Sequence, residues 1–203
     1  MDNTTKLLGG WGYIAVLVFG ICTSFLGPVG FILWLAGLVI LMVAYFRAAN
    51  EYNRPAIRND AMIGLILTVV AGLVFMFFIG ASIFGLFLHA GTAFSLAAFG
   101  GRLIAGLIIM WLLGIVGAWF WFRASAALTE ASGQGLFKTG GLLIFIGAII
   151  IIIPILGWLV LFVGQILQTV GFFTTPDRVQ VQQVGVAPIM STAPPPPASP
   201  PTV

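Results

Sequence analysis

GGLLIFIGAIIIIIPILGWLVLFVGQILQTVGFF, residues 140–173, is a run of 34 residues without a charged side chain. As one straight helix it would be about 51 Å long, whereas crossing the hydrocarbon core of a bilayer takes roughly 20 residues. The run therefore holds two crossings, and Pro154 with Gly157 marks the place where the chain folds back. We expect helices over 136–153 and 155–173. The alternative is one long kinked C-terminal helix, which would leave five helices.

The composition of the whole chain points to the same surroundings. Hydrophobic residues make up 61% of the 203 residues, charged residues make up 6%, and the mean hydropathy is +1.17. Soluble domains carry about 25% charged residues. Because so few charges cannot cover a surface that faces water, the solvent of this protein must be lipid.

Four more apolar runs are long enough to cross a bilayer. The predicted spans are residues 7–26, 29–46, 61–88 and 103–122. Gly27 and Pro28 separate the first two by a tight turn, because glycine takes unusual backbone angles and proline cannot continue a helix. The sequence therefore predicts an all-α, polytopic bundle of six transmembrane helices within residues 7–174.

The charges indicate how the bundle is oriented. Six crossings place residues 1–6, the 47–60 and 123–139 loops and the C-terminal tail on one side. That side holds seven of the eight Lys and Arg residues: Lys6, Arg47, Arg54, Arg58, Arg123, Lys138 and Arg178. Cytoplasmic loops carry the excess of Lys and Arg. We therefore expect a multi-pass protein of the cell membrane with both termini in the cytoplasm.

Two segments lie outside the predicted spans and have unusual composition. Residues 175–203 are rich in proline and end in APPPPASPPTV, which favours an extended chain over a packed core. We expect a disordered cytoplasmic tail there. The connector 89–102 is apolar but contains Gly91, Gly100 and Gly101, so it is either a short helix at the outer interface or a loop.

Residues that could carry catalysis are scarce. No carboxylate lies within a predicted span, and the chain has a single histidine, His89, and a single cysteine, Cys22. A metal site needs several such ligands to converge. A Ser-His-acid triad needs His89 beside an acid, although every acid is predicted on the opposite side. The sequence thus predicts no enzyme, no metal and no cofactor. Its cations are scattered through loops, which excludes nucleic acid as a partner.

A few polar side chains fall within the predicted spans. Gln165 and Gln168 are three residues apart and share a helical face, which Thr169 adjoins, and Thr68 lies in the third span. Because an unpaired amide is costly in hydrocarbon, these groups should turn toward protein. They either line a polar path or form hydrogen bonds between helices.

The 26 glycines favour close helix packing, since small residues let backbones approach. The strict Gly-x-x-x-Gly spacing does not occur in the chain. We therefore assign no dimer face.

The cytoplasmic loops hold the candidates for recognition of lipid headgroups or of a protein. These residues are Arg47, Glu51, Arg54, Arg58, Arg123, Glu130 and Lys138. Arg54 precedes Pro55, which is typical of the first turn of a helix, and Arg58 is four residues from Arg54. A cation near the membrane surface contributes about 1 kcal/mol to the binding of anionic lipid. The alternative is that these charges only set the topology.

Two stretches carry a family resemblance. They are the segment from Phe46 through Asn53, Pro55 and Ile57, and the string LFKTGGL at 136–142 followed by Ile-Gly-Ala at 146–148. Together they resemble the membrane-protein family known as domain of unknown function 996, which is common in archaea. The similarity extends over residues 7–174. It implies a multi-pass membrane domain, and it implies no catalytic activity.

We accordingly expect a non-catalytic integral membrane protein that acts as a scaffold or assembly component. Its partners would be membrane lipids, further copies of itself or another membrane protein. The alternative function is a facilitator or channel for a small neutral or weakly polar solute.

Overall fold

The structure is a computed structural model of the chain and describes residues 1–26, 28–88 and 96–177. These residues form six α-helices and no strand, which confirms the predicted all-α class and the number of helices. The helices are α1 (Asn3–Leu26), α2 (Pro28–Glu51), α3 (Pro55–Leu88), α4 (Leu96–Ser132), α5 (Gly135–Ile150) and α6 (Pro154–Thr174).

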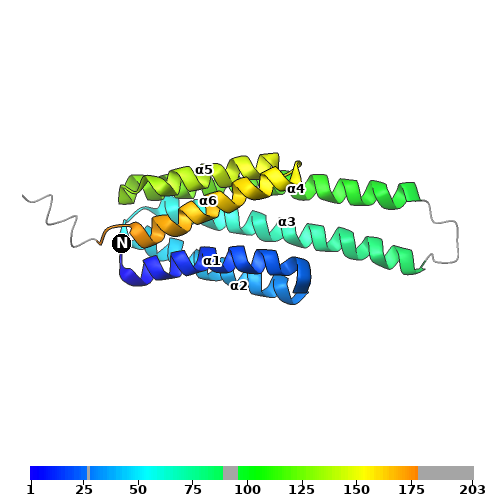
Figure 1. Cartoon of the computed structure of the whole chain (residues 1–203), viewed down its shortest axis with the longest axis horizontal. Coiled ribbons are helices and arrows are strands. Elements are labelled where there is room, and N and C mark those ends of the chain that lie inside the picture. Colours follow the sequence, from blue (N-terminus) through cyan, green and yellow to red (C-terminus); the bar gives the residue numbers. More distant parts are fainter. Residues whose placement is uncertain (27, 89–95, 178–203) are drawn as a thin grey trace, which may run out of the picture.

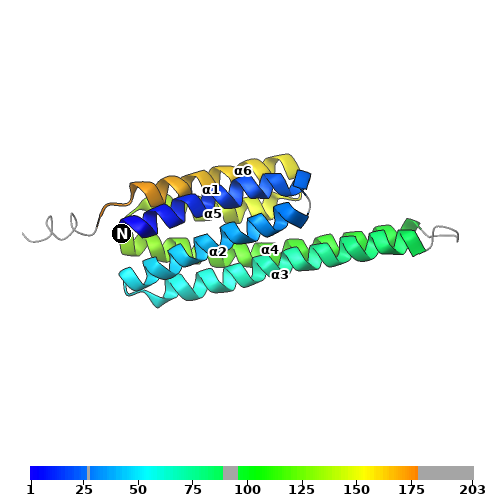
Figure 2. The ribbon, with the colours of Figure 1, turned by 90° about the horizontal axis from the view of Figure 1, so that it is seen from below.

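The helices form a closed ring of three antiparallel hairpins. Each helix packs on the next one along the chain, as short connections require, and α6 completes the ring by packing on α1. Figures 1 and 2 show α1 and α6 side by side, although they lie at opposite ends of the sequence. The N-terminus marks what we call the charged end, where α1, α3 and α5 begin and α2, α4 and α6 end.

The outside of the ring is apolar. Ile32 is 64% exposed and Ile155 is 80% exposed, and many other large hydrophobic residues also face outward. Five helices, α1 to α4 and α6, are long and apolar enough to cross a membrane. The longest two, α3 and α4, have 34 and 37 residues and extend beyond the other four on the right of Figure 1.

Glycines allow the helices of each hairpin to approach closely. A Cβ atom added at Gly140 of α5 would lie 2.8 Å from the carbonyl oxygen of Gly164 in α6, and the reverse contact is also 2.8 Å. Gly164 is the middle one of three buried glycines spaced by seven, with Gly157 and Gly171. Seven residues are nearly two helical turns, so the three share one face. Similar close approaches occur at Gly12 and Gly37 between α1 and α2, and at Gly64 and Gly117 between α3 and α4.

The predicted fold-back near Pro154 is confirmed, so the single kinked helix is wrong. However, α5 ends at Ile150, and a three-residue turn leads to Pro154. Its 16 residues measure about 24 Å, less than a full crossing. The helix thus occupies Gly135–Ile150 of the region where the span 136–153 was predicted, and Ile153 is kept out of a helix because the residue before a proline avoids the helical region. Ile153 indeed has an extended backbone, with φ −100° and ψ 91°.

The last carbonyl groups of α5 find donors inside the protein. The indole Nε1 of Trp111 in α4 donates to the carbonyl oxygen of Ala148 at 3.1 Å. The amide of Ile153 donates to the carbonyl oxygen of Ile150 at 2.8 Å. The final carbonyls of any helix lack partners within the helix, and in apolar surroundings other protein groups must supply them.

At the charged end the helices continue into the segments predicted as loops. Helix α3 begins at Pro55, as the proline predicted, and only residues 52–54 separate it from α2. Asn53 adopts the left-handed conformation with φ 52°, which asparagine tolerates. Helix α4 ends at Ser132, and Gly133, with φ 75°, donates from its amide to the carbonyl of Thr129.

Two of the predicted segments are only partly described. Helix α4 contains the part of the 89–102 connector that begins at Leu96, and residues 89–95 lie outside the described residues. Residues 175–177 of the predicted tail follow α6, and residues 178–203 also lie outside the described residues.

Candidate functional site

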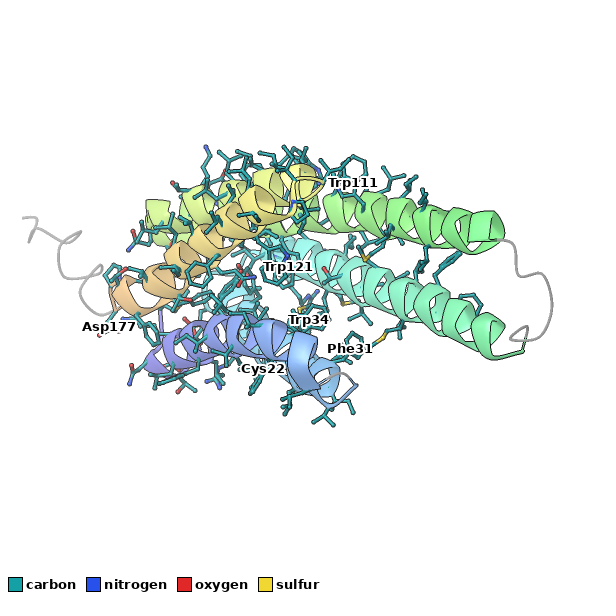
Figure 3. All side chains as sticks on the ribbon, turned by 45° about the vertical axis from the view of Figure 1, so that its right-hand side comes forward. Cys22, Phe31, Trp34, Trp111, Trp121 and Asp177 are labelled. Atoms are coloured by element: carbon teal, nitrogen blue, oxygen red, sulfur yellow. The ribbon has the colours of Figure 1, made fainter. Side chains whose placement is uncertain are left out.

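A cavity of about 210 Å³ lies at the centre of the ring, and all six helices contribute to its wall. We call it the central cavity. It is lined by Tyr13 and Val16 of α1, Trp34, Leu38 and Leu41 of α2, Thr68 and Ala71 of α3, Gly114, Ala118 and Trp121 of α4, Ile144 and Ala148 of α5, and Leu161 and Gln165 of α6. Figure 3 shows Trp34 and Trp121 in the interior between the hairpins. Most of this wall is apolar, and none of its residues carries a formal charge.

A chain of buried hydrogen bonds begins at the cavity wall and runs toward the charged end. The hydroxyl groups of Tyr13 and Tyr45 lie 3.0 Å apart, and the Tyr45 hydroxyl lies 3.2 Å from Ser125 Oγ. The amide Nε2 of Gln168 donates to Ser125 Oγ at 2.8 Å and to the carbonyl oxygen of Phe137 at 2.9 Å. These four polar side chains, Tyr13, Tyr45, Ser125 and Gln168, are here called the polar cluster.

The polar cluster has a preferred direction of donation. Both Nε2 hydrogens of Gln168 are used, so Ser125 accepts one and can donate its own proton to Tyr45. Tyr45 can then donate to Tyr13. In the reverse order the proton of Ser125, which is 1% exposed, would have no acceptor among the described residues. The preferred order leaves the Tyr13 proton available to a molecule in the central cavity.

Aromatic rings pack around the polar cluster and close the ring of helices toward the charged end. Tyr45 makes edge contacts with Trp121 and Phe172, with ring centroids 5.3 and 5.8 Å apart. Phe172 also contacts Phe137 at 4.9 Å. Tyr45, Phe137 and Phe172 are fully buried. The central cavity therefore does not continue as an open path through the charged end.

The four residues of the predicted polar stripe separate in the structure. Gln168 belongs to the polar cluster, and its Oε1 atom is buried without a hydrogen-bond partner among the described residues. Thr68 donates to the carbonyl of Gly64 and accepts from Trp121 Nε1, while Thr169 bonds to its own helix. Only Gln165 both lines the cavity and has a side-chain amide without a hydrogen bond to any described residue.

Three of the seven predicted recognition residues bond within the protein. Arg47 pairs with Asp2 at 3.4 Å, and Arg123 pairs with Asp60 at 3.4 Å. Glu51 accepts from the Asp2 amide at 2.9 Å and from the Thr5 hydroxyl. These contacts hold the N-terminus against the end of α2 and connect α3 to α4.

The other four recognition residues are exposed at the charged end. Arg54, Arg58, Glu130 and Lys138 form no salt bridge with any residue that the structure describes. Their spacing of four residues does not place Arg54 and Arg58 on one helical face, because Arg54 precedes the first residue of α3.

A further salt bridge holds the two termini of the described chain together. Lys6 Nζ lies 2.6 Å from Asp177 Oδ1, and Figure 3 shows Asp177 beside the start of α1. The hydrogen bond from Lys6, together with its charge, lowers the pKa of the Asp177 carboxyl.

Sequence reasoning did not select Tyr13, Tyr45 or Ser125. Tyr45 and Ser125 each lie two residues from an arginine, Arg47 and Arg123, at the edges of the predicted spans. Ser125 was assigned to a loop, although α4 continues through it to Ser132. The residues next to these hydroxyl groups in the sequence do not indicate that the three side chains contact one another in the fold. No group of three or more potential metal ligands occurs within the described part of the chain.

The sequence profile of a family described as a protein of unknown function (DUF996) matches residues 33–166. The chain belongs to this family. The match confirms the resemblance found in the sequence, and it spans α3, α4 and α5 with most of α2 and α6. Trp34, Thr68, Trp121 and Gln165 of the cavity wall lie within the part that matches DUF996.

An uncharacterized protein of Methanocaldococcus jannaschii is 31% identical over 172 residues, which cover 85% of this chain and 92% of that protein. No solved structure matches the chain.

Proposed function

We propose that this DUF996 protein is a non-catalytic, multi-pass protein of the cell membrane that binds a small, weakly polar molecule in the central cavity. The observation that carries the proposal is a cavity of about 210 Å³ with a wall built by all six helices and one end closed by aromatic rings. Small-molecule sites in helical bundles lie between the helices and combine an apolar wall with a few polar groups.

The chemistry of the cavity wall favours a neutral ligand. A charged ligand would lose its hydration and find no opposite charge there, which is costly. Tyr13 can donate a hydrogen bond, and the Gln165 amide can both donate and accept. The wall contains no carboxylate, histidine or cysteine to act as acid, base or nucleophile, which supports a binding role without catalysis.

The arrangement of charges supports an orientation with the charged end in the cytoplasm. Six described cations lie at that end, namely Lys6, Arg47, Arg54, Arg58, Arg123 and Lys138, whereas Arg102 lies near the beginning of α4 toward the other end. Cytoplasmic segments of membrane proteins are richer in such residues. Both termini would then be cytoplasmic, and the central cavity would lie nearer the outer side than the aromatic rings do.

Binding fits the geometry better than an open channel does. A solute that passed through would have to displace Tyr45 and Phe172, which are fully buried. A facilitator role would therefore need a second conformation in which these rings separate.

A role in assembly is a second candidate, favoured by Arg54, Arg58 and Lys138. These cations are exposed at the charged end and form no salt bridge with the described residues. If these cations recognise a protein or lipid partner, Arg54→Lys and Arg58→Lys should weaken the binding of that partner. The same replacements keep the charge, so they should leave the membrane topology unchanged. Co-purification that survives both replacements would remove this candidate.

The binding proposal is tested by filling the cavity. Ala118 is buried in the wall, whereas Val116, two residues away, is 45% exposed on the outside of α4. The probes are neutral molecules from glycerol to 1-octanol. The signal is the part of the tryptophan fluorescence that is lost in Trp34→Phe and Trp121→Phe. We expect a saturable response for at least one probe in the native protein and in Val116→Phe, and its loss in Ala118→Phe.

The proposal fails if no probe gives a saturable response, or if Ala118→Phe responds as the native protein does. Flux of the same probes into reconstituted vesicles addresses the facilitator role. Flux above that of empty vesicles that Ala118→Phe abolishes would establish transport. Binding without flux supports the binding role alone.

A further inference from the structure

A second, smaller cavity of about 100 Å³ lies beside the central cavity, between α1 and α6. We call it the side cavity. The two cavities share four wall residues, Val16, Trp34, Leu161 and Gln165. The two cavities are therefore neighbours, and these four side chains form the partition between them. One of the four is Gln165, whose amide has no hydrogen-bond partner among the described residues.

The spacing between α1 and α6 changes along their length. At the charged end the helices are tightly packed, because a Cβ atom at Gly9 or Gly10 would overlap the rings of Phe172 or Phe173. At Gly20, which lines the side cavity, the nearest described side chain to an added Cβ is Trp34 at 3.7 Å, an ordinary contact. Figure 1 shows α6 moving away from α1 toward its beginning at Pro154.

The outer rim of the side cavity is apolar and faces outward. Ile21, Trp158 and Phe162 line it and are 44%, 51% and 39% exposed. The neighbouring turn between α5 and α6 exposes isoleucine side chains, including Ile152 and Ile153. A turn in water normally carries polar residues, since its backbone needs hydrogen-bonding partners. This apolar rim is suited to lipid.

The depth of the rim follows from the charges on α4. Trp111, which bonds to Ala148 near the end of α5, is nine residues after Arg102 and twelve before Arg123. These separations correspond to about 14 and 18 Å along the helix. If both arginines lie near the surfaces of a hydrocarbon core of about 30 Å, the end of α5 lies inside that core. Pro154, the start of α6, lies at a similar depth.

We propose that the side cavity is a lateral opening from the lipid phase to the central cavity, and that the ligand is a neutral amphiphile with a single chain. This inference rests on the proposed binding function and names its ligand class. The head group, an alcohol or another small neutral hydrogen-bonding group, lies at Gln165 and Tyr13. The chain extends past Trp34 and Gly20 between α1 and α6 into the surrounding lipid.

The test uses the full chain in lipid vesicles and 4-bromo-1-undecanol, whose bromine lies close to the head group and quenches tryptophan fluorescence at short range. The contribution of Trp34 is the difference between the native protein and Trp34→Phe. We expect saturable quenching of this contribution by the alcohol. A bromoalkyl trimethylammonium ion of equal chain length should quench it far less, because the cavity wall offers no charge to pair with it.

Two variants act on the opening in opposite directions. Gly20→Leu fills the side cavity, so a chain could enter only by displacing the new side chain. If this displacement costs about 1.4 kcal/mol, the apparent affinity falls roughly tenfold. Phe162→Ala removes part of the rim and should make quenching faster. Gly101→Leu is the matched control, because Gly101 lines neither cavity and an added Cβ there meets no atom of the described side chains within 4 Å.

The outcomes separate the opening from the binding function. Quenching that is unchanged in both Gly20→Leu and Phe162→Ala overturns the lateral opening, and the binding function survives if Ala118→Phe still abolishes the response. Equal quenching by the charged analogue overturns the neutral ligand class. If Gly20→Leu does not fold, the rate in Phe162→Ala decides the question.

Discussion

At the scale of single residues, Gln168 is a buried side chain that joins three helices. Its amide joins α6 to Ser125 in α4 and to the carbonyl of Phe137 in α5. Gln165, one turn earlier, lines the central cavity instead. Gln165 and Gln168 share one face of α6 but have different surroundings. Gln165 borders the central cavity, and Gln168 lies where α6 packs on α5 and where its amide contacts Ser125 of α4.

We expect Gln168→Leu to lower the free energy of unfolding by about 1–3 kcal/mol, because Ser125 and the Phe137 carbonyl would lose a buried partner. Thr169→Val is the control, since the Thr169 hydroxyl bonds only to its own helix. That change should stay within about 0.5 kcal/mol. Equilibrium unfolding in detergent, followed by circular dichroism, measures both. Equal effects would show that the polar cluster does not stabilise the bundle.

At the scale of elements, the crossing of α5 and α6 depends on glycine. Gly164→Ala would place a Cβ atom 2.8 Å from the carbonyl oxygen of Gly140, so we expect a loss of about 1–3 kcal/mol in stability. Gly114→Ala in α4 is the matched change, because no atom of the described residues lies within 4 Å of its added Cβ. It should stabilise α4 by up to about 1 kcal/mol. Thermal unfolding of both variants shows whether each change raises or lowers the stability. If both variants are more stable than the native protein, the helices are not closely packed at Gly164.

The end of α5 gives a second prediction at this scale. Trp111→Phe removes the donor to the Ala148 carbonyl, so the turn at residues 151–153 should open more often. We expect faster hydrogen exchange there and a loss of about 1–3 kcal/mol in stability. Trp119→Phe is the control, because its half-exposed ring contacts Phe122 and Phe145. Exchange at the turn that is unchanged in Trp111→Phe would show that the indole does not protect α5.

At the scale of the whole molecule, the ring places every helix beside two others and gathers the charges at one end. This arrangement predicts the sidedness of labelling. In a Cys22→Ser background, cysteines introduced at the exposed positions Asn50 and Asn59 should react with an impermeant maleimide in inside-out vesicles. They should not react in intact cells. Labelling of either position from outside intact cells would reverse the proposed orientation.

Much of the fold could be predicted because its causes are local. The length of an apolar run indicates a helix long enough for a bilayer, and a proline within such a run marks a fold-back. For that reason the number of helices and the hairpin at Pro154 could be predicted. The three glycines spaced by seven in α6 also indicate a closely packed helix face, although the Gly-x-x-x-Gly spacing is absent.

The sequence by itself determined the helical class, the order of the hairpins and the gathering of charges at one end, since each follows from residues that are neighbours in the chain. Only the tertiary structure decided that Tyr13, Tyr45, Ser125 and Gln168 meet, which charges pair, and where the cavities lie. These features depend on side chains from helices distant in sequence. Their contacts arise when α6 packs on α1 and closes the ring, and no local pattern encodes that closure.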